Sequence, residues 1–209
     1  MVSEAQGTPN FGRRYAILNL DWMALLLSAI EGTPEGQSLI ENYKKWNEAV
    51  HKKSSQPLTI FTTLAFAHGQ PEVKRGKPFS KLIAPFGDFK AGTPETEIDT
   101  RFTVNEQDIV LAKTRCSATS GSALEQILKA QNIDTVVISG LSLSGVIMST
   151  VYHLFDLDYN IYVIEDNVLE LPPSDTAEFK ALFVQKILPR MNLQVISLET
   201  ALRALEQSS

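Results

Sequence analysis

The chain has 209 residues, 44% of them hydrophobic and 21% charged, with a formal net charge of −5 at pH 7. This length is typical of one domain that buries a substantial core. The mild acidity, without a basic stripe, argues against nucleic acid as a partner. The one cysteine, Cys116, excludes an intramolecular disulfide and fits a reducing compartment. Because no segment has the apolar length of a signal peptide or membrane span, we expect a cytoplasmic protein without a membrane partner.

Short apolar runs alternate with helix-period segments along the chain. Residues 1–12 predict a flexible tail, and 13–209 a single domain. Apolar side chains spaced by three and four predict a helix from about Ser38, and Ser174 is placed to cap a later helix that ends before Pro189. Strands are predicted at 15–20, 58–66, 108–113, 135–139, 160–166 and 193–197, and the other helices at 122–132, beyond Gly140 and at 198–206.

This alternation predicts an α/β fold. Continuous apolar strands separated by helices favour a doubly wound, mainly parallel sheet of about six strands, flanked by helices in a Rossmann-like three-layer sandwich. Ligands of such folds bind beyond the carboxyl ends of the strands. The polar connection over 67–103 is rich in Gly and Pro, and a connection of that length is typically functional or forms oligomer contacts.

Two charged residues stand at predicted strand ends. Asp21 follows the first strand and Lys113 ends the third. A carboxylate and an ammonium that meet at the mouth of a sheet can act as a proton-transfer pair. The alternative is that each is a solvated strand cap.

The residues around this pair resemble the isochorismatase-like hydrolase superfamily. The resemblance is carried by "YAILNLDWM" (15–23), by "KILPR" (186–190) and by the long segment 108–168, which includes "LAKTRCSATSGSAL" and "GLSLSGVIMST". Cysteine hydrolases of this superfamily cleave amides or related bonds with an Asp–Lys–Cys triad. The resemblance places Asp21 and Lys113 on its first two positions and the nucleophile six residues after Gly140, where this chain has Val146. Valine offers no lone pair, so we predict no acyl-enzyme at this position.

The resemblance also implies how the turn after Gly140 is built. The family has a non-proline cis peptide at the position of Leu141–Ser142, which exposes N–H groups at a helix start. We therefore expect Leu141, Ser142, Ser144 and Gly145 to bind a substrate anion or a developing oxyanion through their backbone. The hydroxyl of Ser144 is alternatively a helix cap, and Gly145 permits close packing.

Isochorismatases proper lack the cysteine and use the aspartate as a general acid. By this precedent we predict a hydrolase that acts on a small carboxylated or carbonyl-bearing metabolite by Asp21–Lys113 chemistry. The alternative is a catalytically inactive pseudoenzyme, which binds a small ligand or serves as an oligomeric scaffold. An open pocket at the pair favours the enzyme, and a pocket filled by Leu143, Val146 or Met148 favours the pseudoenzyme.

Three side chains near the strand ends have two readings each. Trp22 and Phe66 either wall an apolar pocket or belong to the core. Arg115 receives an anionic substrate or pairs with an acid such as Glu165 or Asp166.

Other chemistry is weakly signalled. Cys116 is a packing residue or, alternatively, the nucleophile, and a Ser149–His153 base–nucleophile pair is a minor possibility. Nicotinamidase-type relatives bind metal through an Asp-x-His pattern, which "TLAFAHGQP" lacks, so we predict no metal and no cofactor. The resemblance finally implies a homo-oligomer, with 67–103 and the helix beyond Ser144 as the candidate contact surface.

Overall fold

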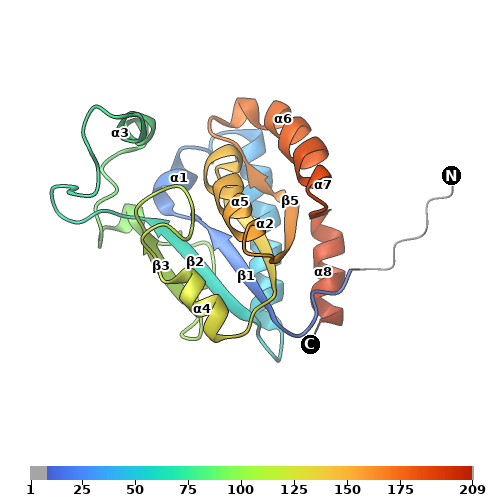
Figure 1. Ribbon diagram of the computed structural model, residues 1–209. Helices are drawn as coiled ribbons and strands as arrows, with labels where there is room; N and C mark the ends of the chain where they lie inside the picture. The colour runs from blue at the N-terminus through green and yellow to red at the C-terminus, as the bar shows by residue number, and fades with distance from the viewer. Residues whose placement is uncertain (1–8, 209) are drawn as a thin grey trace.

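Six strands form one parallel sheet. In the computed structural model, which describes residues 9–208, the strand order is β3-β2-β1-β4-β5-β6 and all neighbours are parallel (Figure 1). The chain winds outward from β1 in one direction and then from β4 in the other, which confirms the predicted doubly wound fold. The strands are β1 (Tyr15–Leu20), β2 (Leu58–Leu64), β3 (Ile109–Lys113), β4 (Thr135–Leu141), β5 (Asn160–Leu169) and β6 (Gln194–Ile196).

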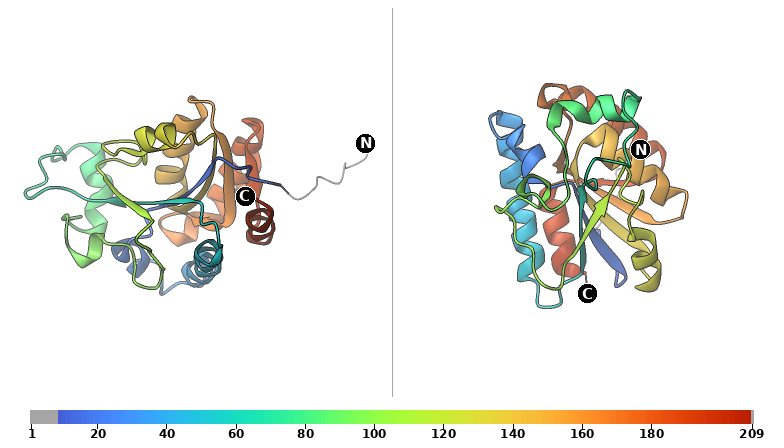
Figure 2. Two further views of the ribbon diagram at one scale, coloured as in Figure 1. Left: turned by 90° about the horizontal axis from the view of Figure 1, so that it is seen from below. Right: turned by 90° about the vertical axis from the view of Figure 1, so that its left-hand side faces the viewer.

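Helices cover both faces of this sheet (Figure 2). Even-numbered residues of β1, such as Leu18, pack in one apolar cluster, while Ile17 packs in the other, because successive side chains of a strand point to opposite faces. The first cluster includes α4 (Leu124–Ala130), α5 (Met148–Phe155) and the helical segment 176–190, and the second includes α2 (Pro34–Lys52) and α8 (Leu198–Gln207). The helices are α1 (Ala24–Ser28), α2 (Pro34–Lys52), α3 (Pro78–Ile83), α4 (Leu124–Ala130), α5 (Met148–Phe155), α6 (Thr176–Phe179), α7 (Leu188–Arg190) and α8 (Leu198–Gln207), with 3-10 turns η1 (Ala84–Phe86), η2 (Pro94–Thr96) and η4 (Pro173–Asp175) and π-helical segments η3 (Leu143–Ile147) and η5 (Lys180–Ile187).

Three predicted helix boundaries are wrong. The helix expected from Ser38 already begins at Pro34, because the Thr33 hydroxyl accepts a hydrogen bond from the Gly36 N–H at 3.1 Å and caps it. Ser174 is not a cap, since its hydroxyl donates to Asp175 Oδ1 instead. The helical segment also includes Pro189, the second residue of α7, which continues directly from η5.

The fifth strand is longer than predicted because it contains an irregularity. Ile138 pairs with Val163, but Gly140 pairs with Val168, so β5 holds extra residues between these two points. β6 pairs with β5 only as far as Ile164. The end of β5 therefore projects past the edge strand, which opens one side of it.

The predicted tail does not extend to residue 12. Phe11 is 2% exposed and packs on Tyr15 and Tyr162, with ring centroids 5.5 and 5.0 Å apart. Its N–H donates to Ser208 Oγ at 2.9 Å, so the start of the described chain is held against the end of α8. Residues 1–8 lie outside the described residues.

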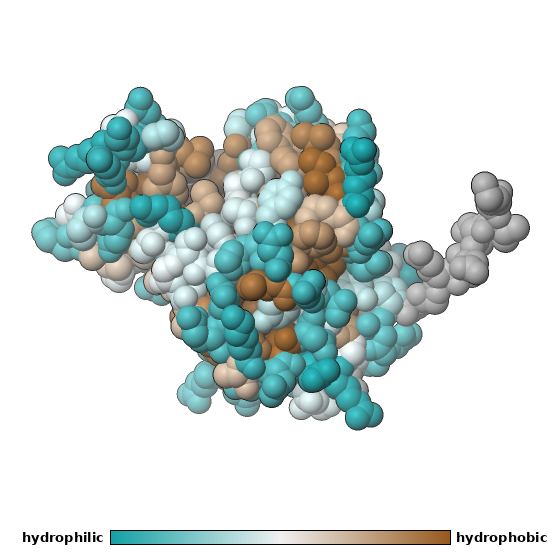
Figure 3. Space-filling model, in the orientation of Figure 1, coloured by the Kyte–Doolittle hydropathy of each residue, from teal (hydrophilic) through white to brown (hydrophobic). Residues whose placement is uncertain are grey.

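The connection over 67–103 forms a projecting arm, residues 67–90, followed by a segment that leads back to the sheet. Residues 67–90, with α3, project from the body (Figure 1), and the bonds of Phe66 with Phe89 and Ala91 close the base of the arm. The arm holds five Lys or Arg residues against two acids, and its tip is hydrophilic (Figure 3), although Leu82 is exposed on it. Within 9–208, no helix has both the length and the apolar character that crossing a bilayer requires.

A buried histidine–carboxylate pair joins α2 to the segment that precedes β3. His51 Nε2 lies 2.8 Å from Asp108 Oδ2, and its Nδ1 lies 2.7 Å from the carbonyl oxygen of Asn47. Both partners only accept hydrogen bonds, so both are satisfied together only by the doubly protonated imidazolium. Burial lowers the pKa of His51, but the bonds to Asp108 and Asn47 and the charge of Asp108 outweigh burial, and the pKa is raised above its ordinary value.

We therefore expect stability to depend on pH through this pair. A raised folded-state pKa means that its contribution is fully present below the unfolded pKa of roughly 6.5 and is lost as pH rises through the folded pKa. In urea unfolding from pH 6 to pH 9, His51→Gln should flatten the decline in stability that the parent chain shows. The exposed His68→Gln serves as the control, and an unchanged pH profile for His51→Gln would contradict the assignment.

Candidate active site

Asp21 and Lys113 meet at the carboxyl edge of the sheet. Lys113 ends β3, Asp21 follows β1, and β2 lies between them. Lys113 Nζ lies 2.7 Å from Asp21 Oδ2, and the two side chains are 0% and 2% exposed. The sequence placed both at strand ends, and the parallel register brings them into one ion pair.

The second oxygen of Asp21 is bound by a residue that the sequence analysis missed. The Thr62 hydroxyl donates to Asp21 Oδ1 at 2.7 Å, and the Asp21 N–H donates to the Thr62 carbonyl at 3.0 Å. Asp21 has φ +60°, a left-handed conformation that Asp and Asn tolerate better than most residues. Leu20 is in register with Thr62. The register of β1 against β2 places Thr62 beside Asp21, but the sequence pattern did not determine this register.

The electrostatics of the pair suit a group that exchanges a proton. Burial raises the pKa of Asp21 above its ordinary value, while the charge and hydrogen bond of Lys113 and the hydroxyl of Thr62 act against this rise. Lys113 Nζ also donates to the Arg115 carbonyl at 2.9 Å, which fixes the ammonium. The carboxyl group can therefore hold or release a proton beside a fixed positive charge.

The turn after β4 is shaped as the resemblance implied. A cis peptide joins Leu141 to Ser142. Gly140 has φ +145°, and a Cβ there would lie 2.1 Å from the Leu20 carbonyl oxygen, so β4 can approach β1 this closely only with glycine. A Cβ on Gly145 would lie 2.8 Å from Ser142 Oγ, in line with its predicted packing role. Neither Ser142 nor Ser144 caps the helix with its hydroxyl, so the predicted cap by Ser144 is wrong.

One backbone donor of this turn is already used. The Ser144 N–H donates to Glu170 Oε2 at 2.7 Å, and Glu170 Oε1 accepts from the Leu171 N–H at 2.8 Å. Glu170 is buried and follows directly after β5. Sequence analysis missed it because the strand was expected to end at Asp166. An acid at the true strand end would have been a candidate by the rule that found Asp21.

Val146, the residue that we predicted at the family's nucleophile position, is part of the core. Val146 is 8% exposed and lies in one apolar cluster with Leu143 and Met148. Its carbonyl accepts from the Thr150 hydroxyl at 2.7 Å, and Thr150 Oγ1 accepts from the Ala118 N–H at 2.9 Å. These bonds tie α5 to the segment that follows Lys113.

The structure shows what the neighbouring side chains Trp22, Phe66 and Arg115 contact. Trp22 is fully buried and stacks on Tyr43 at 3.6 Å between centroids, and Phe66 is buried beside Phe79, so both are core residues. Arg115 does not pair with Glu165 or Asp166. Its guanidinium lies 4.8 Å from the centre of the Phe79 ring, and it donates to the Glu72 carbonyl at 2.9 Å, because it points toward the arm.

The remaining candidates are less suited to chemistry. Burial raises the pKa of Cys116, and Lys113 only partly opposes this, so its reactive thiolate is disfavoured. Ser149 donates to the Val146 carbonyl, and His153 pairs with Glu125 at 2.8 Å, so these two do not form a base–nucleophile pair. Within 9–208, no three His, Cys, Asp or Glu side chains are grouped to hold a metal ion.

Comparisons with known proteins agree with this architecture. The isochorismatase domain matches residues 15–197. N-carbamoylsarcosine amidase of Arthrobacter sp is 25% identical over 146 residues, which are 68% of this chain but 54% of that protein, so the match spans about half of the relative's length.

Solved structures share the fold at low identity. An isochorismatase family protein from Desulfovibrio vulgaris has a TM-score of 0.75 at 19% identity and covers 93% of this chain and 100% of its own. A cysteine hydrolase from Pseudomonas syringae has a TM-score of 0.79 at 15% identity, covering 92% of each chain. N-carbamoylsarcosine amidase from Thermoplasma acidophilum has a TM-score of 0.68 at 23% identity, covering 89% of this chain and 97% of its own.

Proposed function

Because the chain belongs to the isochorismatase family of hydrolases, we propose that it hydrolyses a small carboxylated or carbonyl-bearing metabolite by Asp21–Lys113 chemistry. The proposal includes that no cysteine acts as nucleophile. The observation that carries it is the buried ion pair of 2.7 Å at the carboxyl edge of the sheet. There a carboxyl group with a raised pKa stands beside a fixed ammonium.

In the proposed reaction Asp21 first accepts a proton and later donates it. Its carboxylate takes a proton from a water molecule whose oxygen attacks the substrate carbonyl carbon. The resulting tetrahedral oxyanion then collapses, the bond to the leaving nitrogen or oxygen breaks, and Asp21 returns the proton to the leaving group. Lys113 stabilises the ionised form of Asp21, and Thr62 orients the carboxylate by its hydrogen bond.

The turn from Leu141 to Val146 is the proposed anion site of this reaction. The first N–H groups of a helix have no partner within the helix and can bind a carboxylate or an oxyanion. Since Glu170 already accepts from the Ser144 N–H, a substrate group must use neighbouring donors or displace this side chain.

The first compounds to test follow from the amidase relatives. An amidase that acts on N-carbamoylsarcosine recognises a carboxylate and a ureido carbonyl in one small molecule. N-carbamoyl amino acids carry the same two groups and match the proposed anion site and acid–base pair. No cofactor enters the proposed reaction.

A second candidate function is ligand binding without turnover. The burial of both Asp21 and Lys113 argues against turnover, because a substrate can reach them only if neighbouring side chains move. The packing of Leu143, Val146 and Met148 in one apolar cluster argues against turnover as well. Association with further copies of the chain stays a prediction, and the arm with its exposed Leu82 is the candidate surface.

A screen for hydrolysis tests the proposed function. Release of ammonia or amino acid from N-carbamoylsarcosine and other N-carbamoyl amino acids is measured for the parent chain and for Cys116→Ser. We expect turnover that Cys116→Ser retains within about twofold and that iodoacetamide leaves intact, since the nucleophile is water. Loss of activity in Cys116→Ser would indicate that the Cys116 thiol, and not water, is the nucleophile. Binding without hydrolysis would support the second candidate.

A further inference from the structure

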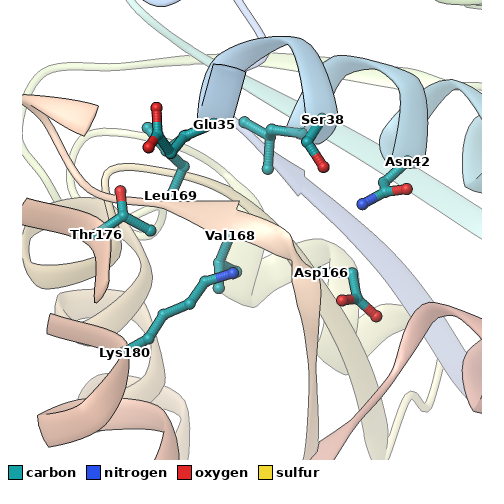
Figure 4. A pocket seen from close by; sticks show the side chains of 9 residues that line it. Glu35, Ser38, Asn42, Asp166, Val168, Leu169, Thr176 and Lys180 are labelled. Atoms are coloured by element: carbon teal, nitrogen blue, oxygen red, sulfur yellow. The ribbon is translucent and has the colours of Figure 1, made fainter. Parts of the chain in front are cut away.

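A polar cavity of about 190 Å³ lies beside the projecting end of β5 (Figure 4). Its walls come from the first turns of α2, from the end of β5 and from the helical segment α6–η5. Asp21 and Lys113 do not line it. Its lining residues are Glu35, Ser38, Leu39, Asn42, Asp166, Val168, Leu169, Thr176 and Lys180.

A lysine supplies the cavity with an ammonium that lacks a partner. Lys180 extends from its helix toward β5, with Asp166 to one side and with Ser38 and Asn42 on α2 across the cavity (Figure 4). Its Nζ makes no hydrogen bond or ion pair with any residue from 9 to 208. Burial lowers the pKa of Lys180, while the charges of Asp166 and Glu165 partly restore it. An ammonium that is partly desolvated without a hydrogen-bonded partner gains from an incoming anionic group.

A fixed carboxylate faces the same space. Asp166 Oδ2 accepts from the Leu198 N–H at 2.6 Å, which anchors the side chain at the start of α8. Its Oδ1 is without a hydrogen bond among the described residues, and the same holds for the side chains of Glu35, Ser38 and Asn42. Acceptors and donors from β5 and α2 thus face the cavity without a hydrogen-bond partner among residues 9–208.

We propose that this cavity is a second small-molecule site, which takes a small zwitterion with one carboxylate and one ammonium, of the α-amino acid class. The single ammonium of Lys180 receives the ligand's carboxylate, and Asp166 receives its ammonium. A polyanion is repelled by the two acids and a plain cation by Lys180, whereas a ligand of both charges matches both. Leu39, Val168 and Leu169 offer an apolar wall to a short aliphatic side chain.

The size of the cavity agrees with this class. It is smaller than the roughly 300–1,000 Å³ typical of pockets for drug-sized ligands. The site is also linked to the candidate active site, since Thr176 Oγ1 accepts from the Glu170 N–H at 3.1 Å and Glu170 holds the Ser144 N–H.

Titration of the full chain with L-alanine and its two half-charged analogues tests the proposal. Amide chemical shifts are followed by NMR as L-alanine, propionate or ethylammonium is added up to 50 mM. L-alanine should shift the amides around Asn42, Asp166 and Lys180 saturably, and each analogue should bind at least tenfold more weakly. Absence of saturable shifts with L-alanine, or equal binding of propionate, overturns the proposal.

Variants locate the binding. Lys180→Met keeps the aliphatic stem and removes the ammonium, so it should weaken L-alanine binding at least tenfold. Lys186→Met, on the same helical segment but not in the cavity, should bind as the parent chain does. If Lys180→Met folds with an unchanged spectrum elsewhere and still binds L-alanine normally, the cavity is not the site.

Discussion

Asp21→Asn should reduce kcat/KM on an identified substrate by about 10²–10⁴-fold, the usual contribution of a general acid–base group. The amide of asparagine can still accept from the Thr62 hydroxyl and tolerates the left-handed backbone found at this position. The substitution therefore removes the exchangeable proton while the local backbone is kept. Steady-state kinetics on a hydrolysed N-carbamoyl compound measure the effect.

The control for this loss is a carboxylate that lies outside the site. Asp156→Asn changes an exposed residue at the end of α5 and should leave kcat/KM within about twofold of the parent value. Circular dichroism and urea unfolding should show that Asp21→Asn is folded. Full turnover by a folded Asp21→Asn chain would eliminate the acid–base mechanism.

Lys113→Met should destabilise the folded chain by about 3–5 kcal/mol, the cost of breaking a buried ion pair on one side. Methionine nearly matches the lysine stem in volume, so the loss comes from the uncompensated carboxylate of Asp21 rather than from a cavity. The free energy of unfolding, measured in urea at pH 7, reports this loss.

The pH dependence of the same variant has a definite sign. Burial already raises the pKa of Asp21, and removal of the Lys113 charge removes a factor that lowers it. At Asp21 the folded state then binds more protons than the unfolded one, so the contribution of this group to stability is highest at low pH and falls as pH rises past the unfolded carboxyl pKa of about 4. Asp21→Asn combined with Lys113→Met should recover part of the loss, because no buried charge remains. A loss below about 1 kcal/mol for Lys113→Met would show that the pair is not buried in solution.

The fold was largely predictable because its signal is local. β1 and β4 are covered on both faces and are therefore continuously apolar in sequence, as in "YAILNL" and "TVVIS". Asp21 and Lys113 stand directly at the ends of such runs, so their position at one edge of a parallel sheet followed without any knowledge of packing.

What escaped prediction depends on contacts between distant segments. Thr62 binds Asp21 because of the β1–β2 register, which no local pattern sets. Glu170 reaches the turn because β5 continues through an irregularity, and the burial of Phe11 depends on the end of α8. Trp22 packs in the core because Tyr43 and Phe102 contact it. An aromatic residue directly after a strand is equally compatible with a pocket wall, so the sequence alone did not distinguish the two.

Under the proposed function, the carboxylate of Glu170 competes with a substrate anion for the Ser144 N–H in the turn after β4. The Ser144 N–H cannot donate to two anions at once. A substrate that uses this donor therefore binds only to those protein molecules in which the Glu170 side chain has left the Ser144 N–H. If that open fraction is about 1%, the apparent affinity is about a hundredfold weaker than the intrinsic one. Under the proposed function, withdrawal of this one buried side chain therefore determines the substrate concentration at which the Ser144 N–H becomes available.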